Sequence, residues 1–447
     1  MLIVLKYVLF ISCIFCQNYS LDDCVAIALK SKKTILSASL EILSAKKGLT
    51  GSYSAFLPSL NFNTNSSRTN FTEQTSISGI DLNLQTFSID TTYSKNDHYR
   101  SVSSGVSLNQ TLYNGGRNFN QIKQARLNLE IANLNQRSVK IEVMQSVINA
   151  YYNLLKDQKL YDVASKNLEM SQQQVDLVEQ QFNLGVVRKT DYLKAKVAEG
   201  QAKVDLLNKK TSLANSRRVL FNNMGLQDFG QSILASDKNW VPYKIPSSSE
   251  LLKKLKDRNP NILLYSKQTQ LKNYNYQVIK GLRKPSIVSS FNYSANAKNF
   301  NMLSEAIKDD WSLGMNLSLS IPIYAGNSLL MQQQQAKISI EQAEYAYINL
   351  VNDFKVQAEL IRELIENYSE IIPLNEAVVL SAEEDLKLVQ ERYSLGSSTI
   401  LEVLDAQISL FRSNTTLINT IHNARIQEAN LKALIGSLDF EYQYKED

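Results

Sequence analysis

A pattern of fifteen residues occurs twice in this chain and limits the folds that it can adopt. QFNLGVVRKTDYLKA spans residues 181–195 and RYSLGSSTILEVLDA spans residues 392–406, so the copies are 392 − 181 = 211 residues apart. Each copy places a Leu-Gly pair at the end of one helical pattern and starts another a few residues later. A glycine there adopts the left-handed conformation that ends a helix and reverses the chain. Two equal reversals predict a duplicated, rod-shaped architecture.

The segment before each reversal is helical in periodicity over an unusual length. Residues 117–183 contain neither glycine nor proline. Residues 328–394 contain Pro373, which we expect either to kink that helix or to remove a hydrogen bond locally. At 1.5 Å per residue each helix would be about 100 Å long. Apolar residues recur every seven positions, which favours coiled-coil packing. Shorter return helices are predicted over residues 189–224 and 400–435.

Each repeat also carries two runs in which apolar and polar residues alternate. These runs occupy residues 60–66 and 102–112 in the first repeat and residues 287–293 and 311–321 in the second. Alternation predicts strands, so each pair indicates a β-hairpin joined by a polar loop. A helix is predicted before each hairpin, over residues 21–56 and 249–284, and Pro58 or Pro285 ends it. Because 285 − 58 = 227 exceeds 211, the extra residues fall in the first hairpin loop, where length varies most freely.

The chain divides into five parts. Residues 1–16 are apolar apart from one lysine and resemble the signal peptide of an exported protein. The alternatives are a lipid-modified Cys13 or Cys16, or a buried N-terminal strand. The remaining parts are the first repeat (17–224), a connecting segment (225–249), the second repeat (250–438) and a charged tail (439–447) that we expect to be disordered.

Composition excludes several classes of function. A net charge of +5 without a basic block gives no indication of nucleic-acid binding. His98 and His422 fall in unrelated contexts, and Cys24 is the one cysteine beyond the leader, so catalytic triads and metal centres lack their residues. We therefore expect no enzymatic activity and no cofactor, and we expect Cys24 to pack on its helix beside Val25 and Ala28. No run of eighteen apolar residues follows the leader, so a membrane role would have to come from the strands.

If the strands cross a membrane, one copy of the chain is not enough. Four strands are too few to close a barrel, and lipid does not tolerate open strand edges. Copies of the chain would have to combine, and three copies would supply twelve strands.

Four motifs resemble the TolC-type outer-membrane factor family over residues 21–438: FNLGVVRKTD, YSLGSSTILEVLDA, FLPSLNF and PIYAGN. The resemblance implies a mixed α and β fold, mostly α, in which three chains form a twelve-strand β-barrel in the outer membrane and an α-helical barrel in the periplasm. It implies a passive exit duct for efflux or type I secretion that works with an inner-membrane transporter and a periplasmic adaptor. The alternative is a soluble, duplicated coiled-coil scaffold without a pore, because the alternation at residues 311–321 would also suit a soluble core.

The resemblance further implies that acidic residues near the tips narrow the tunnel or hold it closed. The matching residues here are Asp191, Tyr393, Glu402 and Asp405. Glu402 and Asp405 are three apart and share a helix face, so three chains would place a ring of carboxylates around the opening. Such a ring would favour cations and basic ligands. The alternative for these residues is an ordinary solvated helix face.

This chain departs from the family at Ser398, where an arginine is common. We expect Arg188 or Lys189, on the first tip, to supply the ionic link instead. The resemblance also implies that the tips dock the hairpins of the adaptor. The candidates are Leu184, Gly185, Leu395 and Gly396. The alternative is that each glycine only caps its helix and each leucine only packs on its own turn.

Overall fold

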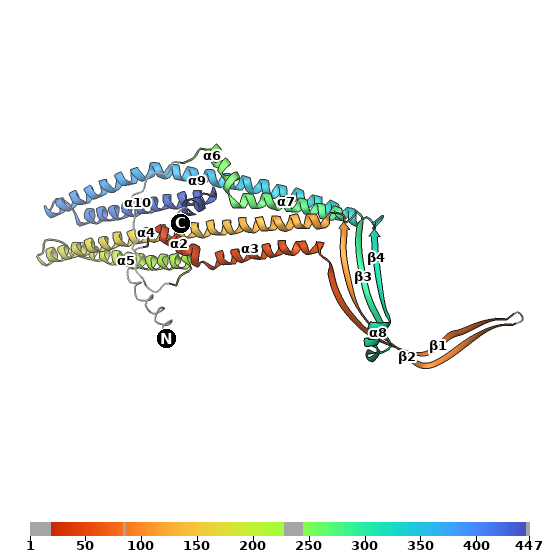
Figure 1. Cartoon of the computed structure of the whole chain (residues 1–447). Coiled ribbons are helices and arrows are strands. Elements are labelled where there is room, and N and C mark those ends of the chain that lie inside the picture. Colours follow the sequence, from red (N-terminus) through yellow and green to blue (C-terminus); the bar gives the residue numbers. More distant parts are fainter. Residues whose placement is uncertain (1–18, 84–85, 228–244, 444–447) are drawn as a thin grey trace, which may run out of the picture. The chain divides into compact units, whose positions relative to one another are not determined.

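The computed structural model describes residues 19–83, 86–227 and 245–443, which form two compact units (Figure 1). The first unit holds the described parts of residues 1–43, 130–268 and 343–447. The second unit holds those of residues 44–129 and 269–342. The predicted leader and most of the predicted connecting segment lie outside the described residues.

The four helices beside the reversals begin and end within one residue of their predicted bounds. α4 (Arg117–Asn183) and α9 (Ser328–Ser394) contain 67 residues each, and α5 (Lys189–Met224) and α10 (Ile400–Leu434) return from the reversals. α9 continues through Pro373 as one helix. None of the helices in the described ranges combines the length and apolar character needed to cross a membrane.

The two helices that precede the strands are each interrupted, which corrects the prediction of continuous helices there. Their parts are α2 (Leu21–Ser31) and α3 (Lys33–Ser52) in the first repeat and α6 (Ser248–Arg258) and α7 (Pro260–Gly281) in the second. The interruptions fall at Lys32 and Asn259, which are extended with ψ of 120° and 119°. Asn259 precedes a proline, which disfavours the helical conformation in the residue before it. The spacing 259 − 32 = 227 equals that of Pro58 and Pro285, so the interruption belongs to the duplicated plan.

At each interruption, the glycine that ends a return helix packs against the backbone of the interrupted helix. Gly225 has φ 76° and lies against the backbone of Lys32, and Gly436 has φ 63° and lies against the backbone of Asn259. Because 436 − 225 = 211, the same joint occurs in both repeats.

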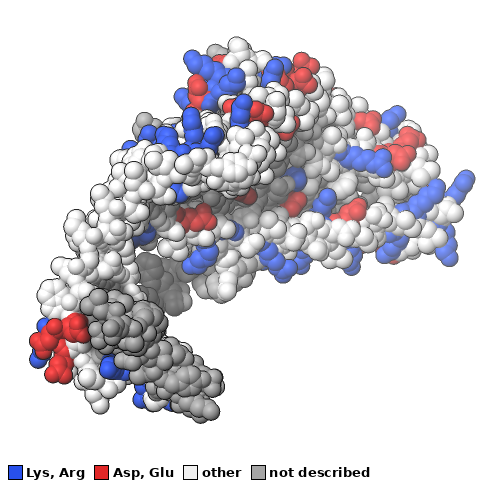
Figure 2. Space-filling view, turned by 90° about the vertical axis from the view of Figure 1, so that its right-hand side faces the viewer, with Lys and Arg blue, Asp and Glu red and all other residues white. Residues whose placement is uncertain are grey.

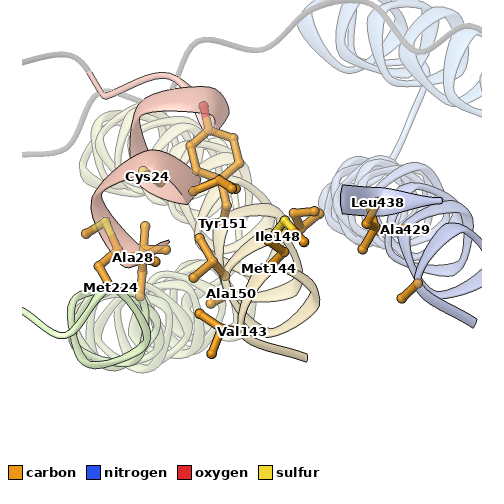
Figure 3. Packing of buried hydrophobic residues seen from close by; sticks show 14 of the residues in the cluster. Cys24, Ala28, Val143, Met144, Ile148, Ala150, Tyr151, Met224, Ala429 and Leu438 are labelled. Atoms are coloured by element: carbon orange, nitrogen blue, oxygen red, sulfur yellow. The ribbon is translucent and has the colours of Figure 1, made fainter. Parts of the chain in front are cut away.

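Buried residues of the first unit form three apolar clusters. The largest joins α2, α4, α5, α10 and the C-terminal helix α11 (Leu438–Gln443). Figure 3 shows its packing, with Cys24 and Ala28 of α2 beside Met224 of α5. Cys24 therefore packs with Val25 and Ala28 as predicted. A second cluster lies between the tips, and a third joins α6, α7, α9 and α10.

The C-terminal tail is ordered as far as Gln443, which corrects the prediction of disorder for residues 439–443. Leu438 is buried in the largest cluster, and the Arg137 guanidinium pairs with the Asp439 carboxylate at 2.6 Å. The same guanidinium lies over the Phe440 ring, 5.4 Å from its centroid. A charged tail can be held by a partner distant in sequence, which a local pattern does not reveal.

The second unit contains one antiparallel sheet with strand order β1-β2-β3-β4. The strands are β1 (Ser59–Asn83), β2 (Thr86–Asn114), β3 (Ser286–Ala297) and β4 (Trp311–Ser320). Most of the predicted polar loop between the first two strands is itself paired strand, which corrects that prediction. Its register places Thr75 opposite Tyr93 and Ile80 opposite Ile89, and such β-branched and aromatic residues favour strands even in a polar segment.

The predicted loop of the second hairpin also contains structure. A short 3₁₀ turn (Phe300–Met302) leads into the helix α8 (Leu303–Asp309). Asn299 caps the turn, because its side-chain oxygen accepts a hydrogen bond from the N–H of Met302 at 3.1 Å. The pairing of β2 with β3 joins the two hairpins into one sheet.

Candidate functional site

The first tip joins α4 to α5. Gly185 is left-handed with φ 76°, and its N–H donates to the carbonyl of Phe182 at 2.9 Å. The N–H of Val186 donates to the carbonyl of Gln181 at 2.9 Å. This pair of bonds is the Schellman arrangement that ends a helix at a glycine. The glycine acts through its backbone, and the side chain of Leu184 beside it is 79% exposed.

The second tip repeats this geometry. Gly396 has φ 74°, its N–H donates to the carbonyl of Tyr393 at 3.0 Å, and the N–H of Ser397 donates to that of Arg392 at 2.9 Å. Leu395 is 82% exposed. Both tips thus combine a glycine that caps a helix with a leucine whose side chain is exposed. The capping role of each glycine therefore leaves the leucine beside it accessible.

The tips differ in how the return helix begins. At the second tip Thr399 and Glu402 form a capping box, in which each side chain accepts a hydrogen bond from the other's backbone N–H at 3.4 Å. The hydroxyl of Ser398 donates to the Glu402 carboxylate at 2.8 Å. Hydrogen bonds from Ser398 and then Thr399 lower the pKa of Glu402. At the first tip the corresponding residue is Arg188, which makes no side-chain cap.

Tyr393 connects the two tips within the chain. Its hydroxyl donates to Oε1 of Gln181 at 2.7 Å, which links α9 to α4. Burial raises the pKa of Tyr393, and the negative charge of Asp191 raises it further. The structure therefore brings Tyr393 and Asp191 into one electrostatic environment, and both side chains are half-buried.

The other predicted tip residues stand apart from this pair. Asp405 and Arg188 are exposed, and Glu402 is exposed with its carboxylate engaged by its own helix cap. Within the described part of the chain, Arg188 and Asp191 form no ion pair, although the N–H of Asp191 donates to the Arg188 carbonyl at 3.0 Å. Nor do the described residues contain a group of three or more His, Cys, Asp or Glu side chains placed to hold a metal ion.

Sequence reasoning missed the contacts that fix the tips. The rings of Phe182 and Tyr192 stack with centroids 5.8 Å apart, and the Tyr192 hydroxyl donates to Glu179 at 3.1 Å. Two aromatic residues on either side of a reversal are the signal that could have indicated this contact. Beneath both tips lies a cluster of buried residues: Val175, Val178, Ala195, Val389, Ile400, Val403 and Leu404.

The sheet presents a second surface of functional interest. Apolar and aromatic residues lie in register across all four strands: Phe62, Val106, Tyr293 and Leu313 in one row, and Leu60, Leu108, Phe291 and Met315 in another. The row between them is Asn61, Ser107, Asn292 and Gly314. Because side chains alternate between faces, one face of the sheet is apolar and the other polar. All ten residues of β4 are exposed.

This part of the sheet also carries no charge. Residues 59–67, 101–114, 286–297 and 311–320 contain no Asp, Glu, Lys, Arg or His. Figure 2 shows the strands as white surface, and charged groups gather beyond them near α8. The ten residues of β4 span about 33 Å, close to what a strand needs to cross a bilayer. β1 and β4 are the two edges of this sheet.

The chain is similar to known proteins in both sequence and fold. Residues 25–226 and 251–437 match the family described as outer membrane efflux protein. The outer membrane protein TolC of Escherichia coli strain K12 is 26% identical over 304 residues, which cover 65% of this chain and 60% of TolC. The cation efflux system protein CusC of the same strain is 23% identical over 347 residues, which cover 75% of this chain and 73% of CusC.

Solved structures show the same fold. A crystal structure of CusC aligns with a TM-score of 0.80 at 20% identity and covers 94% of this chain and 93% of that one. The prediction of a mixed, mostly α fold is confirmed by this likeness.

Proposed function

The chain belongs to the outer membrane efflux protein family, as its motifs predicted, and we propose that it forms a passive exit duct across the outer membrane. Three copies combine in this proposal, and their helices form a tunnel in the periplasm. An inner-membrane transporter supplies the energy, and a periplasmic adaptor joins the transporter to the duct. The duct serves a tripartite efflux pump or a type I secretion system.

The observation that carries this proposal is the uncharged, two-faced sheet. An apolar face suits lipid and a polar face suits a water-filled lumen. The unpaired N–H and C=O groups at the edges of β1 and β4 cannot remain open in a bilayer. Pairing β4 of one copy with β1 of the next closes three sheets into a barrel of twelve strands. A soluble scaffold would instead leave the apolar face of β4 in water.

The tips supply the narrow end of the duct in this proposal. Asp191 and Asp405, one from each repeat, would form acidic rings in the trimer and favour cations. Glu402 adds negative charge there, and the hydrogen bonds from Ser398 and Thr399 that lower its pKa favour the charged carboxylate. Arg188 or Lys189 would pair with these carboxylates across the boundary between chains and hold the tip closed.

The exposed leucines beside the reversals support docking of the adaptor. Leu184 and Leu395 point apolar side chains into water from rigid, glycine-capped turns. Large apolar side chains on a rigid support are typical of interaction sites. The adaptor would contact the two tips alternately around the ring.

Single-channel recording in a planar bilayer tests the proposed function. The purified full-length protein is expected to give discrete, long-lived, cation-selective steps. Replacement of Asp191 and Asp405 by asparagine is expected to reduce the selectivity for cations while the pore remains. Purified protein that inserts and never conducts would overturn the duct. Unchanged selectivity in the double variant would overturn the acidic constriction alone.

A further inference from the structure

We propose that two columns of opposite charge, one on α9 and one on α5 of a neighbouring copy, form an ion-pair ladder that sets the contact between chains. This inference rests on the proposed ring of copies and names the surfaces that meet in it. Both columns lie on the first unit: the column on α9 occupies the half of that helix nearer the tip, and the column on α5 runs along most of its length.

The acidic column follows the seven-residue repeat of α9. Its members are Glu363, Glu370, Glu384 and Glu391, with Ala377 at the remaining position, and all five are exposed. A seven-residue spacing keeps side chains on one stripe of a coiled-coil helix. Within the described part of the chain these four carboxylates form no ion pair. The equivalent positions of α4, 211 residues earlier, are Tyr152, Lys159, Lys166, Gln173 and Gln180, so this charge belongs to the second repeat alone.

The basic column follows the same repeat on α5. Its members are Lys189, Lys196, Lys203, Lys210 and Arg217. The four lysines are exposed, and three of them, Lys196, Lys203 and Lys210, lie away from both ends of the helix. Among those three, Lys196 has two partners on its own helix: its Nζ lies 3.9 Å from the Glu199 carboxylate and 5.9 Å from the centroid of the Tyr192 ring. The equivalent positions of α10 are Ile400, Gln407, Asn414, Ile421 and Glu428. The duplication therefore conserved the shape of the helices but not these charges.

The contact within one chain shows which helices meet between chains. Asn430 of α10 accepts hydrogen bonds from Gln145 and Asn149 of α4, at 2.8 and 3.1 Å. Arg425 of α10 lies over the ring of Tyr152 of α4, 5.5 Å from its centroid. The long helix of the first repeat thus packs on the return helix of the second. In a closed ring of duplicated chains the same contact recurs, with α9 packing on α5 of the next copy.

Moving the contacts by 211 residues gives the register. The bonds of Asn430 map onto Val219 of one copy facing Val356 and Leu360 of another. These three side chains are 44%, 69% and 56% exposed in the single chain. The three hydrogen-bonded amide side chains of the contact within the chain are therefore replaced by exposed apolar side chains at the equivalent positions. Exposed apolar side chains are stabilised by burial, and in this register Val219 of one copy and Val356 and Leu360 of the other bury one another.

The same register brings the charged columns together. The contact of Tyr152 with Arg425 maps onto Glu363 facing Ala214, whose neighbours on the helix surface are Lys210 and Arg217. The helices run in opposite directions, so each step of seven along α9 is a step of seven back along α5. Glu370 then lies between Lys203 and Lys210, and Glu384 lies between Lys189 and Lys196. Ala377, the uncharged position, falls opposite Gly200, so the small residues also coincide.

Charge reversal in full-length protein in detergent tests the ladder. The variants are Lys196→Glu with Lys203→Glu and Lys210→Glu, the reverse set Glu363→Lys with Glu370→Lys and Glu384→Lys, and the two sets combined. Exposed pairs are individually weak, so three are reversed at once. Each set alone is expected to weaken trimer association at least about tenfold, and the combined variant to recover it. Higher salt should reduce the difference in trimer association between the wild-type protein and each reversed set, because salt screens exposed charges.

The matched control reverses three exposed acidic residues that follow a different stripe of α4: Asp162→Lys, Glu169→Lys and Asp176→Lys. It is expected to leave association unchanged. Equal loss in the control, or no recovery in the combined variant, would overturn the ladder. A wild-type protein that is monomeric would instead overturn the proposed function. A wild-type trimer that conducts and is indifferent to both reversals would overturn the ladder alone.

Cysteine cross-linking tests the register without changing charge, should a reversed variant fail to fold. Ala377→Cys with Gly200→Cys, in a chain whose own cysteines are replaced by alanine, is expected to give covalent trimers under a mild oxidant. A Cβ at Gly200 meets no atom within 4 Å, so the substitution has room. The control pairs Ala377→Cys with Asn208→Cys, about 12 Å further along α5. Cross-linking of the control but not of the Gly200 pair would overturn the register.

Discussion

The two repeats build the same joint from different side chains. In each, an interrupted helix receives the left-handed glycine that ends a return helix. In the first repeat the hydroxyl of Ser31 donates to the carbonyl of Met224 at 2.6 Å. In the second the amide of Asn259 donates to the carbonyl of Leu434 at 2.6 Å, and its oxygen accepts from the N–H of Ile262 at 3.0 Å. Spacing thus determines the backbone plan, and each repeat satisfies the polar groups in its own way.

The second joint is tighter than the first. Replacing its glycine should therefore lower the free energy of unfolding more than the same change at the first joint, and this is the largest difference that we predict between the repeats. A Cβ at Gly436 would lie 2.5 Å from the Arg258 carbonyl oxygen, whereas one at Gly225 would lie 3.3 Å from Lys32. Gly436→Ala is expected to lower the free energy of unfolding by about 3 kcal/mol and Gly225→Ala by about 1.5 kcal/mol. Denaturant titration followed by circular dichroism measures both. Gly396→Ala, with open space around it, is the control at about 1 kcal/mol. Equal losses at the two joints would contradict the difference.

Removing the side chain at each interruption sharpens the same comparison. Asn259 is buried and makes three hydrogen bonds, so Asn259→Ala is expected to cost about 2 kcal/mol of unfolding free energy. Lys32 is more exposed and donates to the Asn222 carbonyl at 2.7 Å, so Lys32→Ala is expected to cost less than about 1 kcal/mol. Asn259→Asp keeps the acceptor but places a buried carboxylate oxygen against the Leu434 carbonyl oxygen, and should cost at least as much as Asn259→Ala. A larger cost at Lys32 would be inconsistent with the structure.

The tips offer a comparison that works in both directions. Thr399→Ala removes the capping box of α10 and is expected to cost about 1 kcal/mol of unfolding free energy. Arg188→Thr supplies the missing cap of α5, because Asp191 already stands three residues later, and is expected to stabilise by about 0.5 kcal/mol. Thermal unfolding of the two variants measures both signs. Destabilisation by Arg188→Thr would show that Arg188 has another role in the folded chain.

Acid should affect the second tip through Glu402. The folded state lowers its pKa through the bonds from Ser398 and Thr399, so this stabilisation is present at neutral pH. It is lost as the pH falls through the lowered pKa, below the ordinary range of a glutamate. The wild-type and Glu402→Gln proteins should therefore differ less in thermal midpoint in acid than at neutral pH. A difference that does not change with pH would contradict the capping role of the carboxylate.

The sequence predicted the elements that follow from a local, periodic pattern. It did not predict those that depend on contacts with residues distant in the chain. The bounds of α4 and α9 follow from seven-residue repeats and from Leu-Gly reversals, which are local. Pro260 is a local signal of the interruption at Asn259 that the prediction of a continuous helix did not use, and the spacing of 227 residues could have indicated the counterpart at Lys32. The order of α11 depends on Arg137, some three hundred residues away from Asp439.

At the tips, residue type and position were predictable and bonding was not. The exposure of Leu184 and Leu395 follows from a glycine turn at the end of a rod. The bond from Tyr393 to Gln181 depends on how two repeats pack, and the use of Glu402 in a capping box competes with its predicted place in an acidic ring. Roles that depend on neighbouring chains stay predictions.

The mass of the purified full-length protein in detergent, measured by light scattering with the detergent contribution removed, tests the central proposal most directly. The proposed closure of the sheet edges and the proposed ladder between α9 and α5 both require copies of the chain to combine in a ring. We predict three copies per particle. A stable monomer or dimer at micromolar concentration would contradict the ring of copies, and with it the twelve-strand barrel.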